Sequence, residues 1–235
     1  MKILIIGAAG MIGMRLARSI IKDDFNGAIH DITLFDVIPP KIENHKNSYK
    51  IKTGDISDPN IISELIDQKP DIIYHLAAIV SGDAEENFEK GWDINAKGTW
   101  HLLEGIRKKF LTSNGSYKPK FIYASSLAVF SGPYPSAIND DFSPNPESSY
   151  GAQKLVGEIL INEYSRKGFL DGVALRLPTI VVRPGKPNKA ASSFYSSIIR
   201  EPLNGIEAIL PVPENLCHWF ASPLSAVRFL RHAAK

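Results

Sequence analysis

The sequence has one cysteine, Cys217, among its 235 residues, which excludes an intramolecular disulfide. Such a chain suits a reducing compartment, so we expect a cytoplasmic protein. A large excess of either charge is also absent, because lysine and arginine number 27 and aspartate and glutamate 25. The net charge of +2 therefore gives no electrostatic reason to expect nucleic acid or a membrane surface as a partner.

Long hydrophobic runs are missing as well. The apolar segment at residues 3–6 is too short for a membrane helix, and the glycines that follow it do not fit a signal peptide. Internal repeats and low-complexity tracts are not found. The apolar content of 44% is enough to bury a sizeable core in one large domain, or in one domain with a smaller lobe.

What the sequence does contain is a regular alternation of short apolar segments and helical patterns. Continuous apolar runs predict buried strands, and apolar residues spaced three or four apart predict helices. Such alternation is typical of an α/β protein with a doubly wound parallel sheet, the Rossmann arrangement. The predicted strands are residues 2–6, 31–36, 49–53, 71–76, 120–125 and 172–177, and the predicted helices are 11–21, 59–67 with Asp58 as N-cap, about 85–110 and 149–167.

The alternation ends after the last predicted strand. Residues 178–235 predict loops, short helices, a short strand near 206–210 and a final helix from about Ser222. We assign residues 1–178 to a dinucleotide-binding domain and 179–235 to a smaller substrate-binding lobe. Residues 131–147 predict a long loop, which in a compact domain is often functional.

Three glycines at three-residue spacing, Gly7, Gly10 and Gly13, connect the first strand to the first helix. Such a turn directs backbone N–H groups and a helix N-terminus at one place, which favours a pyrophosphate. The spacing differs from the usual G-x-G-x-x-G, and a glycine-rich turn without a ligand is the alternative. We expect this turn, with Met11 and Ile12, to bind a dinucleotide.

Asp36 ends the second predicted strand. A carboxylate there accepts hydrogen bonds from a ribose 2′-hydroxyl and repels a 2′-phosphate, so NAD is favoured over NADP. The alternative is a solvated aspartate at a strand end. Further cofactor contacts are expected where the third and fourth strands end, at Asp55, Ile56, Leu76, Ala77 and Ala78.

Tyr150 and Lys154 are one helical turn apart and share a face of the helix predicted at 149–167. A free tyrosine, with a pKa of about 10, is a poor base, and bringing it near 7 takes roughly 4 kcal/mol. An ammonium group about 6 Å away supplies roughly 3 kcal/mol at an effective dielectric constant of about 20. With an oxidised nicotinamide nearby, the pair predicts an activated phenolate, although Y-x-x-x-K alone also occurs on solvated helix faces.

Two serines, Ser125 and Ser126, follow the fifth predicted strand and reach the same cleft. A serine hydroxyl there can orient a substrate hydroxyl or carbonyl toward Tyr150. Neighbouring strand residues point to opposite faces, so only one of the two serines can be the orienting group.

In combination, these motifs resemble the extended short-chain dehydrogenase/reductase family, also described as NAD-dependent epimerases and dehydratases. The resemblance covers about residues 1–182. It rests on the three glycines, Asp36, HLAA at 75–78, Asn95, SSLAVF at 125–130, YGAQK at 150–154 and LRLP at 175–178.

The resemblance implies catalysis by Ser126, Tyr150 and Lys154, with Lys154 also bonding the nicotinamide ribose. It implies that Asn95 supports a proton-relay water and that Pro178, Thr179 and Ile180 hold the carboxamide. Ser126 is preferred over Ser125 because it stands four residues before an aromatic residue, here Phe130. We expect NAD as the cofactor and no metal.

Family members that eliminate water carry an Asp-Glu pair directly after this serine. Leu127 and Ala128 occupy those positions here, which argues against a sugar dehydratase.

The segment after the sixth strand carries the cations Arg183, Lys186, Lys189 and His218. Arginine binds a carboxylate with a planar fork, so the cluster predicts a small acidic substrate. The alternatives are a solvated loop for the two lysines and simple packing for His218, beside Trp219.

Residues 178–192 and HWFASP at 218–223 resemble the D-erythronate dehydrogenase branch of the family. That resemblance implies oxidation of a small sugar acid at C2 with NAD. Family members usually continue beyond this length, so we expect the C-terminal part of the substrate lobe to be missing. The family also implies a homodimer through the two long helices. A nucleotide-sugar 4-epimerase and a non-enzymatic NAD sensor are the competing hypotheses.

Overall fold

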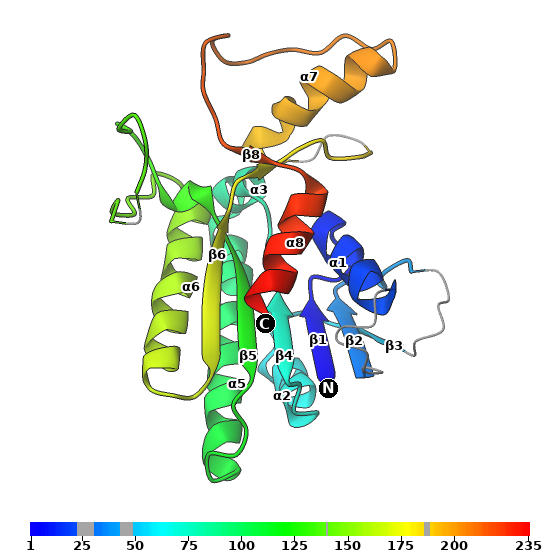
Figure 1. Cartoon of the computed structure of the whole chain (residues 1–235), viewed down its shortest axis with the longest axis vertical. Coiled ribbons are helices and arrows are strands. Elements are labelled where there is room, and N and C mark those ends of the chain that lie inside the picture. The colour runs from blue at the N-terminus through cyan, green and yellow to red at the C-terminus, as the bar shows by residue number, and fades with distance from the viewer. Residues whose placement is uncertain (23–30, 43–48, 140, 186–188) are drawn as a thin grey trace.

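A six-stranded parallel sheet forms the centre of the computed structural model, which describes residues 1–22, 31–42, 49–139, 141–185 and 189–235 (Figure 1). The strand order is β3-β2-β1-β4-β5-β6, and every neighbouring pair is parallel. The order reverses between β1 and β4, and ligands of such sheets bind at the carboxyl ends near this point. The predicted doubly wound sheet is confirmed. Its strands are β1 (Lys2–Ile6), β2 (Asp31–Asp36), β3 (Tyr49–Thr53), β4 (Ile72–His75), β5 (Lys120–Ser126) and β6 (Asp171–Leu177).

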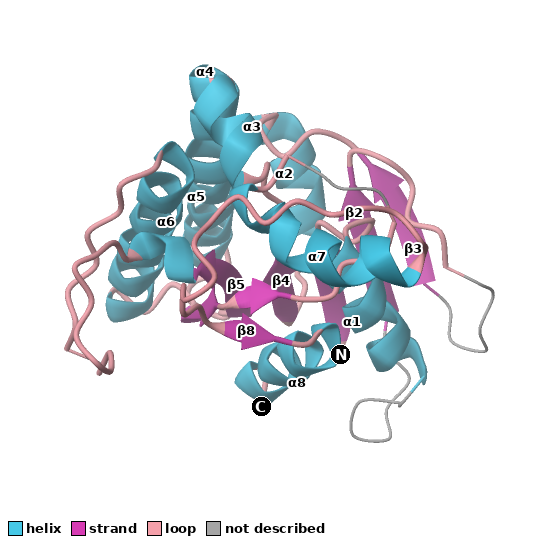
Figure 2. Cartoon of the chain, turned by 90° about the horizontal axis from the view of Figure 1, so that it is seen from above, coloured by secondary structure: helices cyan, strands magenta, loops and turns pink. Residues whose placement is uncertain are grey.

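Helices cover both faces of the sheet, as Figure 2 shows from above. Side chains alternate along β1, so Leu4 and Ile6 face the layer of α2, α5 and α6, while Ile3 and Ile5 face α1 and α8. The inner strands β1 and β4 are therefore buried on both sides, which explains their continuous hydrophobic runs, whereas the edge strand β3 is largely exposed. The helices are α1 (Met11–Lys22), α2 (Pro59–Asp67), α3 (Ser81–Glu86), α4 (Phe88–Gly91), α5 (Gly98–Thr112), α6 (Ser149–Arg166), α7 (Phe194–Leu203) and α8 (Pro223–Ala233).

The single helix predicted at about 85–110 is instead a series of shorter elements. The chain leaves helical geometry at Asn87, between α3 and α4, with φ −123° and ψ 71°. A π-helical turn, η2 (Trp92–Lys97), then joins α4 to α5. Irregular turns of this type often occur at functional sites, and η2 contains Asn95.

The C-terminal segment differs from the prediction in one strand. Residues 206–210 form no strand, because an exposed apolar run has no neighbouring strand to pair with there. The short parallel pair β7 (Thr179–Ile180) and β8 (Phe220–Ala221) forms instead. The helix predicted from about Ser222 is confirmed as α8, with Ser222 as its N-cap.

The C-terminal elements occupy two different places. In Figure 1, α7 lies beyond the carboxyl ends of the strands, whereas α8 returns to the sheet beside α1. Val227 and Leu230 of α8 are buried in the core with Leu16 of α1. The last helix of the predicted substrate lobe therefore belongs to the layered core. Within the described ranges, no helix has the length and apolar character needed to cross a bilayer.

Candidate active site

The glycine turn is built by close backbone contact. Gly7 has φ +87°, and a Cβ atom there would lie 2.5 Å from the backbone nitrogen of Ala77. A Cβ atom on Gly13 would lie 2.1 Å from the carbonyl oxygen of Gly7. A Cβ atom on Gly10 would lie a tighter-than-usual 3.3 Å from the same oxygen. Glycine is thus required for the turn to close against the end of β4, and α1 begins directly after it at Met11.

Asp36 is attached to the same turn. Its Oδ2 accepts a hydrogen bond from the backbone N–H of Ala9 at 2.8 Å, and its Oδ1 accepts one from Val37 at 2.7 Å. The carboxylate keeps further lone pairs for a ribose hydroxyl. Asp55 is exposed and accepts hydrogen bonds from Ser57, but Ile56 is only 3% exposed and packs in the core. The Ile56 side chain is therefore part of the core, and a cofactor contact at Asp55 and Ile56 stays a prediction.

A tight packing contact brings the catalytic candidates together. The N-cap of α6 is Ser148, whose Oγ accepts from the N–H of Gly151 at 3.1 Å. A Cβ atom on Gly151 would lie 2.1 Å from the carbonyl oxygen of Ala128, so the start of α6 rests on the turn η3 (Leu127–Val129) after β5. Ser126 thereby hydrogen-bonds Tyr150, whereas Ser125 donates to Glu158.

Lys154 is almost completely buried one turn along α6. Its Nζ donates to the carbonyl oxygen of Ala124 at 2.8 Å, and it lies 4.6 Å from the ring centre of Tyr123 and 5.6 Å from that of Tyr150. The tyrosine and the lysine therefore share a face, as their spacing indicates.

The activated phenolate stays a prediction, and burial of the site works against it. Burial raises the pKa of Tyr150 to about 12, although the positive charge of Arg183 and the Ser126 hydrogen bond both lower it. Burial also lowers the pKa of Lys154 to about 7, although the negative charge of Glu158 raises it. Desolvation disfavours the charged form of both groups, and for each it outweighs the opposing effect of its neighbours.

Asn95 braces the site through its side-chain amide. Its Oδ1 accepts from the N–H of Ile79 at 2.9 Å, and its Nδ2 donates to Ile79 O at 3.3 Å and to Gln153 Oε1 at 2.7 Å. Both amide hydrogens are thus used within the protein, so the side chain offers a relay water at most an acceptor lone pair. Asn95 connects the segment after β4 to α6.

A cavity of about 350 Å³ lies where these elements meet. Among the residues predicted from sequence, it is lined by Leu76, Ala78, Ser125, Ser126, Tyr150, Lys154, Pro178, Thr179, Ile180, Arg183 and His218. Sequence reasoning missed Val80, Ser81, Ala124, Leu127, Ala128, Ser148, Leu177, Ala190, Ala191 and Ser192. Most of these are small residues without a chemical signature, although Ser148 could have been found as the N-cap of α6.

Arg183 and His218 reach this cavity from the C-terminal segment. The backbone N–H of Arg183 is held by Ser196 Oγ at 3.0 Å, and its guanidinium charge acts on Tyr150. The pairing of β7 with β8 places His218 Nε2 2.7 Å from Thr179 Oγ1, and the imidazole stacks on Tyr195. Burial lowers the pKa of His218, so it contributes a neutral polar ring and not the predicted cation.

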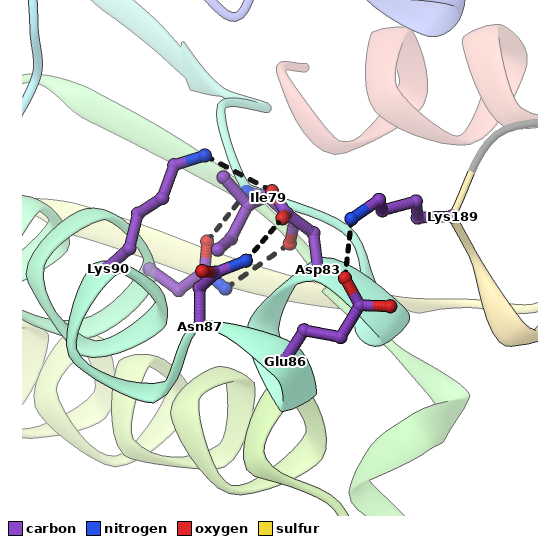
Figure 3. Close-up of polar contacts among 7 residues, drawn as sticks. Ile79, Asp83, Glu86, Asn87, Lys90 and Lys189 are labelled. Atoms are coloured by element: carbon purple, nitrogen blue, oxygen red, sulfur yellow. Dashed lines mark hydrogen bonds and ion pairs between the residues drawn. The ribbon is translucent and has the colours of Figure 1, made fainter.

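Lys189, which was expected from the sequence to bind substrate, does not line the cavity. Its ammonium forms an ion pair with Glu86 of α3, and both side chains are exposed (Figure 3). The same segment is attached to α3 through the N–H of Gly82, which donates to Lys189 O at 3.0 Å. Lys186, the other expected lysine, lies outside the described residues.

Comparisons with known proteins agree with this geometry. The chain is 45% identical over 233 residues to D-erythronate dehydrogenase of Haemophilus influenzae, covering 99% of this chain and 72% of that protein. It is 44% identical over 236 residues to D-erythronate dehydrogenase of Cupriavidus necator, covering 98% and 71%. A crystal structure described as a nucleoside-diphosphate-sugar epimerase from Agrobacterium tumefaciens superimposes with a TM-score of 0.92 and 48% identity, covering 100% of this chain and 69% of that one. Residues 3–215 match the NAD dependent epimerase/dehydratase family, and the chain belongs to that family.

Proposed function

We propose that this protein is an NAD-dependent oxidoreductase that oxidises a secondary hydroxyl of a small sugar acid, D-erythronate or a close analogue, at C2. The observation that carries the proposal is one cavity that contains a tyrosine with a serine partner, a buried lysine and an arginine. The relatives named D-erythronate dehydrogenase, at 44–45% identity, support the substrate class.

The residues at the carboxyl ends of the strands fit the dinucleotide. Gly7, Gly10 and Gly13 carry no Cβ atoms that would hold a pyrophosphate away from the turn, and the N-terminus of α1, at Met11 and Ile12, would favour its charge. Asp36 would accept from the adenosine ribose. The segments after β4 and β6 would hold the nicotinamide end, through Leu76, Ala77, Ala78, Pro178, Thr179 and Ile180.

The chemistry assigns separate tasks to the side chains of this chain. Tyr150 would accept the proton of the substrate hydroxyl, and Ser126 would hold that hydroxyl toward it. NAD held by the residues named above would supply the hydride acceptor for C2. Lowering the pKa of Tyr150 from about 12 to near 7 requires about 7 kcal/mol. Charged Lys154 would contribute about 3 kcal/mol of this, at 5.6 Å from the ring.

The cavity favours a small anionic substrate. Arg183 supplies a guanidinium group beside Tyr150, and a guanidinium fork matches a carboxylate. His218 adds a neutral polar ring near Thr179. The cavity, of about 350 Å³, is at the low end of ligand pockets.

A nucleotide-sugar 4-epimerase is the second candidate, and one observation favours it. The Agrobacterium tumefaciens structure, at 48% identity, is described as a nucleoside-diphosphate-sugar epimerase. An epimerase would retain tightly bound NAD and show no net oxidation.

We also propose a division of labour along the chain and a dimer. Residues 1–178 would bind NAD, and 179–235 would bind substrate, apart from α8 in the core. Exposed apolar side chains on α5 and α6, namely Trp100, Leu111 and Ile159, fit a homodimer contact through these helices. Sedimentation of the wild type and of Ile159→Glu would test it, and equal masses for both would contradict it.

The function is tested by mixing the protein with NAD and a panel of four- to six-carbon sugar acids and following the absorbance of NADH. The proposal expects turnover with D-erythronate and loss of turnover in Tyr150→Phe. NAD that remains bound through gel filtration, together with conversion of nucleotide sugars and no NADH from any acid, would favour the epimerase.

A further inference from the structure

A buried carboxylate lies one helical turn beyond Lys154. Glu158 is 5% exposed and stands on α6 between two strands of the sheet. Its carboxylate accepts a hydrogen bond from Ser125 Oγ of β5 and three from the guanidinium of Arg176 of β6, at 2.8–3.1 Å. A carboxylate is costly to bury even when it is paired, and packed apolar residues often replace such pairs without loss of stability. Packing alone therefore does not require a charged side chain at this position.

Arg176 fixes the carboxylate from the other side. Its guanidinium lies 4.8 Å from the ring centre of Phe130, which follows Ser126 after the η3 turn. Ser125 and Ser126 are neighbours on β5, so their side chains point to opposite faces of the strand. The two serines thus have different partners: Ser126 contacts Tyr150, and Ser125 contacts Glu158.

The charged and titratable groups around Lys154 come from four elements. His75 of β4 and Tyr123 of β5 lie beside it, Tyr150 and Glu158 share its helix, and Arg176 of β6 reaches it only through Glu158. Burial lowers the pKa of His75 to about 3 and raises those of both tyrosines, so these three groups are neutral near pH 7. Among the described groups that act on Lys154, Glu158 is therefore the anion.

We propose that Glu158 is a positioning residue whose negative charge keeps the buried Lys154 protonated, and that Ser125 and Arg176 hold the carboxylate in place for this purpose. The inference rests on the proposed function, because Lys154 assists Tyr150 only in its charged form. Without Glu158, burial would lower the pKa of Lys154 further, so that at neutral pH a smaller fraction of the lysine would carry the charge that helps the phenolate.

The test is a direct titration of Lys154 in the full chain by NMR of ¹³C-labelled lysine, with its signal identified by its loss in Lys154→Met. An opposite charge about 4–6 Å away shifts a pKa by about 1–3 units. Since Arg176 neutralises part of the field, Glu158→Gln should lower the pKa of Lys154 by about one unit. Glu158→Asp, which keeps the charge, should retain most of the wild-type value. The matched control is Glu163→Gln, on the exposed face of α6, which should leave Lys154 unchanged.

An unchanged Lys154 pKa in Glu158→Gln would overturn the proposal. So would an equal fall in Glu158→Asp, because packing and not charge would then be responsible. If Glu158→Gln does not fold, Arg176→Gln decides: it should raise the pKa of Lys154 by exposing it to an unneutralised carboxylate, and a fall would contradict the inference. The titration needs no substrate, so its result stands whether or not the chain oxidises a sugar acid.

Discussion

Replacing Lys154 with methionine removes one charge from the site and keeps a side chain of similar length. The ammonium lies 5.6 Å from the ring centre of Tyr150, and a unit charge at that distance stabilises a phenolate by about 3 kcal/mol at an effective dielectric constant of about 20. That free energy corresponds to about a 100-fold change in rate. We therefore expect kcat/KM for D-erythronate to fall at least about 100-fold in Lys154→Met at neutral pH.

The assay is the initial rate of NADH formation at several substrate concentrations. Lys167→Met is the matched control, because Lys167 is an exposed residue at the other end of α6 and should retain wild-type kinetics. Circular dichroism of both variants checks the fold. A kcat/KM within a few-fold of the wild type for Lys154→Met would refute the assignment of an electrostatic role to this lysine.

The other predictions concern the fold and the remaining parts of the site. The free energy of unfolding should rise as pH increases from about 7 toward 10, because the lowered pKa of buried Lys154 makes the unfolded chain bind more protons in that window. Denaturant titration should show a smaller rise in Lys154→Met. An equal rise in the two proteins would contradict the burial of this ammonium. Gly13→Val should abolish NAD binding in calorimetry, since its Cβ would meet Gly7 O at 2.1 Å, and normal heat of binding would show that the turn is not the dinucleotide site. Arg183→Lys should raise KM for the sugar acid about 10-fold with a folded protein, because a bidentate contact becomes a single one, and an unchanged KM would exclude a carboxylate contact. Lys189→Ala should leave KM nearly unchanged, because its partner is Glu86 and not a ligand, so a large rise in KM would return Lys189 to the site.

The centre of the sheet could be predicted from the sequence because inner strands such as β1 and β4 are continuous apolar runs that are buried on both faces. Residues 2–6 and 71–76 illustrate this, and their positions agree with β1 and β4 to within a residue or two. The segment 206–210 shows the limit of the same rule, since an apolar run forms a strand only where another strand is available to pair with it. Helical periodicity reports neither the break at Asn87 nor the π-helical turn around Asn95, and Asn95 makes tertiary hydrogen bonds to Ile79 and Gln153.

The site was predictable where a motif fixes local geometry and not where burial decides chemistry. Spacing alone places Tyr150 and Lys154 on one face, and the glycine pattern locates the turn. The ionisation of the pair was not predictable, because desolvation by surrounding strands and helices has no signature in the local sequence. The roles of Ser125 and Glu158 likewise follow only from the meeting of β5, β6 and α6.

The central claim is that this cavity removes hydride from C2 of a small sugar acid. It is tested most directly with D-erythronate that carries deuterium at C2, incubated with the protein and NAD, followed by mass spectrometry of the reduced cofactor. The account predicts NADH that contains one deuterium, formed by the wild type and not by Tyr150→Phe. Reduced cofactor without deuterium, or substrate that remains unchanged while the protein binds NAD, would contradict it.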